Sequence, residues 1–226
     1  MFRLVKEEAL AYLKLGILAP QKHKIRANTT QRAPLGVIFV PGMGANGSQF
    51  LALRDYLSAH AEWFDAYEYS SLSHLPQLAQ GLVHRLARSA AHCERVVVVG
   101  HSLGGLLTRM ALQAEEAPSH VAGFVSICAP LHGTWRSKLA PYPSLRQLSP
   151  ESPLMTQLFS QGHRLDRLRG RILTIGARRD QFIQPHTSAF LEGHEQLLLE
   201  DVAHAASLFD RRAHQHIADF VGRLPR

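Results

Sequence analysis

One serine of this chain stands in a sequence context that could make it a nucleophile. Ser102 is the middle residue of the pentapeptide Gly-His-Ser-Leu-Gly at positions 100–104. Four valines precede the motif at 96–99, and apolar residues at helical spacing follow it as far as Glu115. A buried strand, a sharp turn and a helix are what a nucleophile elbow requires, because the strained turn exposes the serine hydroxyl. The motif therefore predicts nucleophilic attack by Ser102, with flanking glycines because a Cβ there would clash.

The residues around this serine resemble those of a known superfamily. Gly-His-Ser-Leu-Gly-Gly is typical of lipases, and the chain resembles the α/β-hydrolase superfamily, within it the bacterial serine lipases and esterases. The resemblance extends from about Leu35 to His204 and includes Ala-Pro-Leu-His-Gly-Thr at 129–134, which is similar to the Thr-Pro-x-x-Gly-Ser/Thr segment of bacterial lipases. It implies an α/β fold in which a mostly parallel sheet of about six strands is flanked by helices and carries a small cap insertion.

The resemblance also implies a catalytic triad in the chain order Ser102, Asp180, His204. Superfamily members carry Gly-x-x-x-Asp-x-x-Val/Ile-x-Pro after a late strand, and Asp180 occupies the aspartate position of that pattern. His204 lies on the loop after the last expected strand, where the superfamily keeps its base. Asp201 is a rival acid, but it lies too close to His204 on the same loop. Alternative bases, which open a strand or lie within a helix, are His194, His214 and His216.

Two backbone amides are expected to form an oxyanion hole. Superfamily lipases carry a His-Gly-x-Gly loop after their first central strand; here Pro41 replaces the histidine and the glycines Gly42 and Gly44 remain. By this resemblance the Met43 amide is one donor, and the amide of Leu103, directly after the nucleophile, is the other. Losing one such donor costs about 3–4 kcal/mol of transition-state stabilisation.

These residues together predict hydrolysis of carboxylic esters, in the manner of a lipase or esterase, through an acyl-enzyme intermediate. An acyltransferase or thioesterase could use the same triad, because a fold alone does not separate these activities. A lipid- or protein-binding module that retains the fold without catalysis is a further alternative, which an intact triad disfavours. No cofactor or metal is expected, since none of the spacings typical of zinc ligands occurs among the histidines and cysteines.

The substrate is expected to contact the loops beside the triad and an insertion at about 131–169 that forms a cap. Loops carried by a rigid sheet commonly set substrate choice. Alternatively, the apolar residues of the insertion only pack it onto the domain, and the loop residue His132 only caps a turn. The expected substrate-binding residues are Gly42, His101, Leu131, His132, Leu154, Met155, Leu158 and Phe182.

The elements that must position these residues follow from periodicity and turn signals. A lead-in at 1–34 precedes a hydrolase domain at 35–226, and a stretch at 24–27 is either a short edge strand or part of a linker. Strands are expected at 36–40, 65–69, 96–99, 121–128, 171–176 and 197–199. Helices are expected at 1–20, 49–60, 75–91, 103–115 and 202–220.

Composition limits the partners. The chain has 226 residues, 46% of them hydrophobic, and a formal net charge of +7, which favours anionic surfaces. The arginine run at 164–179 lacks interleaved aromatic residues, so nucleic acid is not expected as a partner. Charged residues interrupt the first helix, so a signal peptide is not expected there. The helix either packs on the domain or makes a peripheral membrane contact. A small-molecule or lipid ester is the expected substrate and the cytoplasm, with membrane association, the expected location; the oligomeric state stays open.

Overall fold

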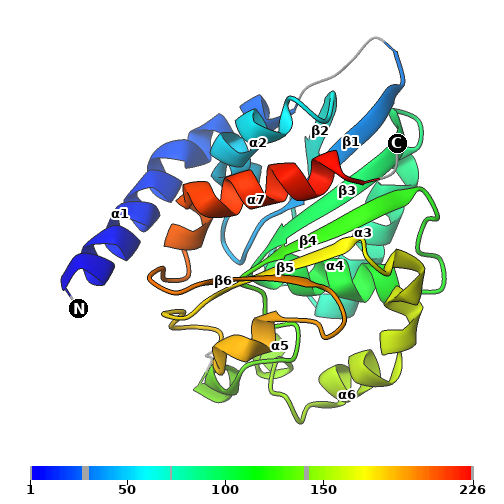
Figure 1. The fold of residues 1–226 in the computed structure, drawn as a ribbon. Helices are drawn as coiled ribbons and strands as arrows, with labels where there is room; N and C mark the ends of the chain where they lie inside the picture. Colours follow the sequence, from blue (N-terminus) through cyan, green and yellow to red (C-terminus); the bar gives the residue numbers. More distant parts are fainter. Residues whose placement is uncertain (1, 27–30, 72, 140–142, 225–226) are drawn as a thin grey trace.

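A parallel sheet organises the molecule and ends at the candidate site. The structure, a computed structural model, describes residues 2–26, 31–71, 73–139 and 143–224. It contains six parallel strands in the order β2-β1-β3-β4-β5-β6 (Figure 1). The strands are β1 Ala33–Val40, β2 Trp63–Ala66, β3 Cys93–His101, β4 Val121–Ile127, β5 Ile172–Ala177 and β6 Glu195–Leu199. The predicted α/β class with a parallel sheet is confirmed.

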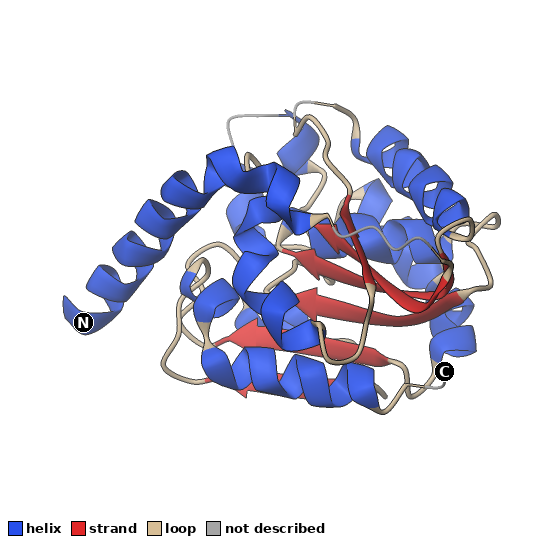
Figure 2. Cartoon of the chain, turned by 90° about the horizontal axis from the view of Figure 1, so that it is seen from above, coloured by secondary structure: helices blue, strands red, loops and turns tan. Residues whose placement is uncertain are grey.

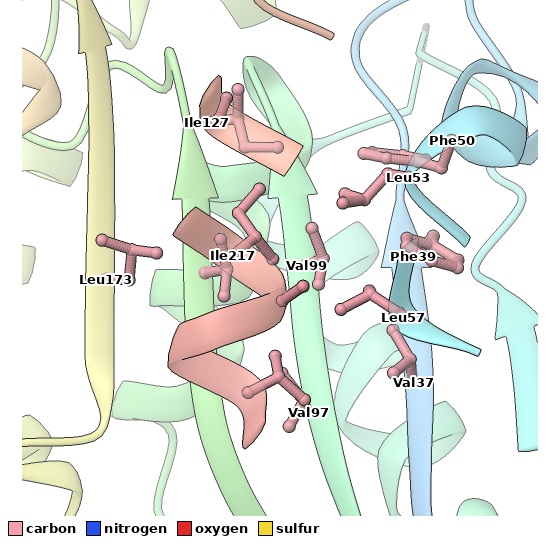
Figure 3. Packing of buried hydrophobic residues seen from close by; sticks show 14 of the residues in the cluster. Val37, Phe39, Phe50, Leu53, Leu57, Val97, Val99, Ile127, Leu173 and Ile217 are labelled. Carbon is pink, nitrogen blue, oxygen red and sulfur yellow. The ribbon is translucent and has the colours of Figure 1, made fainter. Parts of the chain in front are cut away.

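Helices cover both faces of this sheet and create two hydrophobic cores. The helices are α1 Phe2–Leu18, α2 Leu51–Leu57, α3 Leu75–Ser89, α4 Leu103–Gln113, α5 Pro143–Arg146, α6 Pro153–Ser160 and α7 Arg211–Gly222. Val97 and Val99 of β3 lie in the core beneath α2 and α7, as Figure 3 shows. Val96 and Val98 lie in the core beneath α3 and α4. Burial on both faces explains the uninterrupted run of valines.

Two segments are added to the sheet and its covering helices. Residues between β4 and β5 form the cap from short helices, including α5, α6 and a 3-10 helix at Gly162–Leu168. The first turns of α1 project from the body of the molecule, and its last turns lie against it (Figure 2). Within the described residues, no helix is both long and apolar enough to cross a bilayer.

The last helix begins later than its periodicity predicts. We expected a helix over 202–220, but α7 starts at Arg211, and a 3-10 turn at Ala206–Phe209 precedes it. Asp210 caps α7, because its carboxylate accepts hydrogen bonds from the amides of Arg212 and Ala213 at 2.9 and 3.2 Å. The candidate base His204 therefore lies on a loop. The optional strand at 24–27 is absent over Lys24–Ile25, which belongs to a 3-10 helix, and residue 27 lies outside the described residues.

Candidate active site

Ser102 occupies a strained turn between β3 and α4. Its backbone has φ 53° and ψ −124°, a conformation rare for a residue with a side chain. The turn is tight enough that a Cβ at position 104 would lie 2.1 Å from the carbonyl oxygen of Val40, and one at position 100 would lie 2.6 Å from the Cα of Gly105. Only glycine fits at either position. The arrangement is the strand–turn–helix that the motif predicts.

A buried carboxylate and imidazole form the next part of the site. The Nδ1 atom of His204 lies 2.7 Å from Oδ2 of Asp180, and the two side chains are 8% and 2% exposed. The other oxygen of Asp180 accepts hydrogen bonds from the amides of Phe182 and Ile183, at 2.8 and 2.9 Å. Because a carboxylate only accepts, His204 Nδ1 donates its proton and Nε2 keeps a lone pair. Such an imidazole can act as a base.

Two rings hold the sides of the His204 imidazole. The Phe182 ring meets it edge-on, with ring centroids 5.1 Å apart. The ring of His101 is tilted against it at 4.9 Å. His101 is buried and neither of its nitrogens has a hydrogen-bond partner within the described structure; burial, and next the neighbouring His204, lowers its pKa well below the usual value. His101 thus stays neutral and adds no second positive charge when His204 is protonated.

Ser102 and His204 open onto one apolar pocket of about 390 Å³. Seven of the residues predicted from the sequence lie in its wall: Gly42, Met43, His101, Ser102, Leu103, Phe182 and His204. Asp180 lies behind His204, outside this wall. The pocket also has a polar side, to which Arg136 and Ser137 contribute. Its volume lies in the range that binds small organic ligands.

The amides of Met43 and Leu103 are available as oxyanion donors. No hydrogen bond from either amide is found among the described residues. The loop before Met43 is held by Tyr69, whose hydroxyl donates to the carbonyl of Pro41 at 2.7 Å, and by Ser71, which accepts from the Gly44 amide at 2.9 Å. Replacement of the superfamily histidine by Pro41 therefore leaves a supported loop beside the serine.

Five of the predicted substrate-binding residues do not line this pocket, and their contact with a substrate stays a prediction. They are Leu131, His132, Leu154, Met155 and Leu158. Met155 and Leu158 are buried against the core beneath α4, and Leu154 packs on the same core. Arg109 and Gln113 of α4 hold them there, because both side chains donate to the carbonyl of Leu158. His132 stacks on Phe159 instead, with ring centroids 5.2 Å apart.

Three functional residues of the pocket region escape prediction from the sequence. Tyr12 and Leu15 of α1 line the pocket, and Glu8 of the same helix contacts the loop that carries His204. Burial, and next the charges of Glu8 and Asp180, raise the pKa of Tyr12 to about 12. The only available signal is their spacing, which places all three on one face of a helix. Two residues of the cap, Leu145 and Leu148, also line the pocket.

The alternative acid and bases lie elsewhere. Asp201 pairs with Arg212 at 2.7 Å on the surface. The Nε2 atoms of His214 and His216 engage the carbonyl of Leu208 and the carboxylate of Glu195, respectively, and His194 is outside the pocket. Within the described part of the chain, no cluster of three or more histidine, cysteine or acidic residues could hold a metal.

Comparisons with known proteins agree with this fold. The model of the alpha/beta hydrolase family matches residues 37–224. Among solved structures, a mature lipase from Bacillus licheniformis is 12% identical and aligns 87% of this chain with 93% of its own at a TM-score of 0.66. A lipase-esterase related protein from Clostridium acetobutylicum is 13% identical, with coverages of 87% and 98% and a TM-score of 0.56. These likenesses establish the fold alone, and no curated protein matches the sequence.

Proposed function

Because the chain belongs to the alpha/beta hydrolase family, we propose that it is a serine hydrolase that cleaves carboxylic esters through an acyl-enzyme. The observation that carries this proposal is the convergence of Ser102 and His204 on one pocket, with Asp180 at 2.7 Å from the imidazole. The three residues come from separate loops at the carboxyl ends of β3, β5 and β6. Packing alone gives no reason for a buried His–Asp pair beside a strained serine.

In the proposed reaction, these residues act first in acylation of Ser102 and again in deacylation. His204 Nε2 removes the proton of Ser102 as Oγ attacks the ester carbonyl, and Asp180 stabilises the resulting imidazolium. The amides of Met43 and Leu103 stabilise the oxyanion. The imidazolium protonates the leaving alcohol, and the acyl group stays on Ser102. Water then attacks the acyl carbonyl while His204 Nε2 removes its proton, and the imidazolium returns this proton to Oγ of Ser102 as the acyl–Oγ bond breaks and the acid leaves.

An apolar acyl chain fits the pocket better than a polar one. Leu15, Leu145, Leu148 and Phe182 supply hydrocarbon surface to its wall. We propose that the substrate is an ester with a medium or long acyl chain. Burial of each methylene group of such a chain contributes about 0.8 kcal/mol to binding, so affinity is expected to rise with chain length until the pocket is filled.

Hydrolysis of p-nitrophenyl esters with roughly two to sixteen acyl carbons tests the proposal. We expect Ser102-dependent turnover that rises with chain length, and no turnover by Ser102→Ala. A fluorophosphonate should label Ser102 in the wild type but should not label the Ser102→Ala variant. The Ser126→Ala variant should be labelled like the wild type, because the Ser126 hydroxyl is buried in β4. Labelling without hydrolysis would favour an acyltransferase or a thioesterase, and absence of labelling a non-catalytic module.

We also propose that α1 makes a peripheral contact with an anionic lipid surface. Its outward side chains Val5, Leu10, Leu13 and Ile17 are each at least half exposed, and Lys6 and Lys14 lie among them. Apolar groups beside lysines favour the boundary of a negatively charged bilayer. Met43, Trp135 and Phe182 are exposed on the body of the molecule.

Sedimentation with vesicles tests whether the protein binds a lipid surface through α1. The wild type should sediment with vesicles that contain phosphatidylglycerol, and less so with phosphatidylcholine alone or at high salt. A Leu10→Ser, Leu13→Ser, Ile17→Ser variant should stay in the supernatant, because the changes remove the exposed apolar surface and leave the inward face of α1 intact. Equal recovery of both proteins in the supernatant would exclude the contact.

A further inference from the structure

We propose that Glu8 of α1 is a positioning residue that holds the His204 loop in its working geometry. The carboxylate of Glu8 accepts two backbone hydrogen bonds, from Ala205 to Oε1 and from Ala206 to Oε2, both at 2.9 Å. These are the two amides directly after the candidate base. The inference rests on the proposed function to the extent that it takes His204 as the catalytic base.

The same carboxylate also reaches the loop that carries the candidate acid. Gln181, which follows Asp180, donates from Nε2 to Oε1 of Glu8 at 2.7 Å. The side-chain oxygen of Gln181 in turn accepts from the amide of His204 at 3.5 Å. One side chain thus connects the acid loop after β5, the base loop after β6 and the helix α1.

A carboxylate suits this position better than any other side chain. The amides of Ala205 and Ala206 begin a 3-10 turn, so they have no partner earlier in that turn. Two parallel N–H groups match the two oxygens of Glu8, and hydrogen bonds to an ionised acceptor are stronger than neutral ones. Glutamine would present one acceptor oxygen and one NH₂ group, and the NH₂ group would face an amide that also donates.

Small movements of this loop are expected to matter for catalysis. The contact between Asp180 and His204 is 2.7 Å long, and the backbone of residues 204–206 sets the position of the imidazole ring. A misplacement of about 1 Å can cost about 100-fold in rate. His101 and Phe182 contact the ring from its sides. The backbone that carries the ring is held by the Ser207 hydroxyl, which donates to the carbonyl of His204 at 2.6 Å, and by Glu8 at the next two amides.

Glu8 belongs to a helix that precedes the residues matched by the family model. The family model matches residues 37–224, so α1 lies outside the part that the family shares. Its inward face nevertheless supplies Tyr12 and Leu15 to the pocket wall and Glu8 to the base loop. Helix α1 therefore completes the active site, although it precedes the domain in sequence.

Kinetics of Glu8→Gln and Glu8→Ala test the role, with Glu116→Gln as the matched control because Glu116 is exposed in the turn that follows α4. We expect kcat to fall about 10- to 100-fold in Glu8→Ala, less in Glu8→Gln, and not at all in Glu116→Gln. KM should change by less than about threefold, because Glu8 does not line the pocket.

Amide hydrogen exchange provides a readout that needs no activity. Residues 205 and 206 should exchange faster in Glu8→Ala than in wild type, while β3 keeps its protection. Unchanged exchange at these two amides, or a kcat equal to that of Glu116→Gln, overturns the inference. Failure of the proposed function looks different: the wild type would neither hydrolyse esters nor react with a fluorophosphonate at Ser102, and the exchange experiment would still decide whether Glu8 holds the loop.

Discussion

Asp180 uses its two carboxylate oxygens for two different contacts. Oδ1 accepts from the amides of Phe182 and Ile183, which fixes the orientation of the carboxylate. Oδ2 faces the Nδ1 atom of His204 and sets which imidazole nitrogen carries the proton. The thiol of Cys128 stays protonated beside this pair, because burial, and next the charge of Asp180, raises its pKa well above the usual value. The two backbone amides therefore fix the position of Oδ1, and the contact with His204 fixes the position of Oδ2.

Asp180→Asn is expected to invert the proton arrangement of His204. The amide oxygen will replace Oδ1, because two N–H groups point at that site, so the NH₂ group will face Nδ1. Nδ1 must then accept a hydrogen bond, so the imidazole proton is carried by Nε2. A protonated Nε2 cannot remove the proton of Ser102. We expect kcat to fall about 10⁴-fold without loss of the fold.

Steady-state kinetics of Asp180→Asn and Asp201→Asn test this assignment side by side. Asp201 is exposed and pairs with Arg212 on the surface, so its replacement should leave kcat within about twofold of wild type. A large loss in Asp201→Asn with activity retained in Asp180→Asn would transfer the role of the acid to Asp201.

The cap is attached to α4 by a buried arginine. The guanidinium of Arg109 donates to the carbonyls of Leu131 and Leu158 and to the side chain of Gln113. Burial lowers its pKa to about 10, so it remains charged at neutral pH. The ring of Phe159 lies over the guanidinium at 5.5 Å. These contacts hold the start of the cap at Leu131 and helix α6 against the sheet domain, which explains why α6 faces the core.

Arg109→Met is expected to loosen the cap before the rest of the domain. The carbonyl of Leu131 would lose its guanidinium donor while buried, which costs about 1–3 kcal/mol of unfolding free energy. Urea unfolding measures the loss, and protease cleavage within residues 143–168 should accelerate. Arg88→Met, at an exposed site on α3, should change the unfolding free energy by less than about 0.5 kcal/mol. Equal stability of the two variants would exclude an anchoring role.

At the scale of the whole molecule, α1 joins the site to the outer surface. One face of the helix contacts the base loop and the pocket, and the opposite face exposes Leu10, Leu13 and Ile17 to solvent. A basic chain with a net charge of +7 would bring that exposed face toward anionic surfaces. A lipid surface that contacts α1 would therefore lie next to the element that holds His204.

Buried histidines make the stability of the whole molecule sensitive to mild acid. Burial is the main reason that the pKa values of His101, His132 and His214 are lowered. Between about pH 7.5 and 5.5 the unfolded chain takes up more protons at these sites than the folded chain does, so unfolding becomes easier as pH falls. The stabilisation is fully present above the unfolded pKa of about 6.5 and is lost below it.

Urea unfolding at about pH 7.5 and 5.5 checks this sign. The unfolding free energy should be lower at the acidic value, and His101→Gln should narrow the difference. His163→Gln, at an exposed position of the cap, should leave the difference as in wild type. A protein that is more stable at the acidic pH would show that other groups dominate.

The sequence by itself determined the sheet, the elbow and the candidates for the triad. The valines at 96–99 and the glycines beside Ser102 each act over a few neighbouring residues, so local sterics and burial can be read in order. The places of Asp180 and His204 in the triad are implied by the resemblance to the α/β-hydrolase superfamily. The start of α7 could not be predicted in this way, because 202–210 has helical spacing but turns to bring His204 to Asp180.

Only the tertiary structure decided what surrounds the triad. The cap residues Leu145 and Leu148 line the pocket while Met155 and Leu158 pack on α4, although all four are apolar and belong to one insertion. The contact between Glu8 and Ala205 joins residues 197 positions apart. Hydrophobicity and helical spacing say that a side chain is buried or lies on one face, but not which distant group it meets. That choice is made by packing, which depends on the whole chain at once.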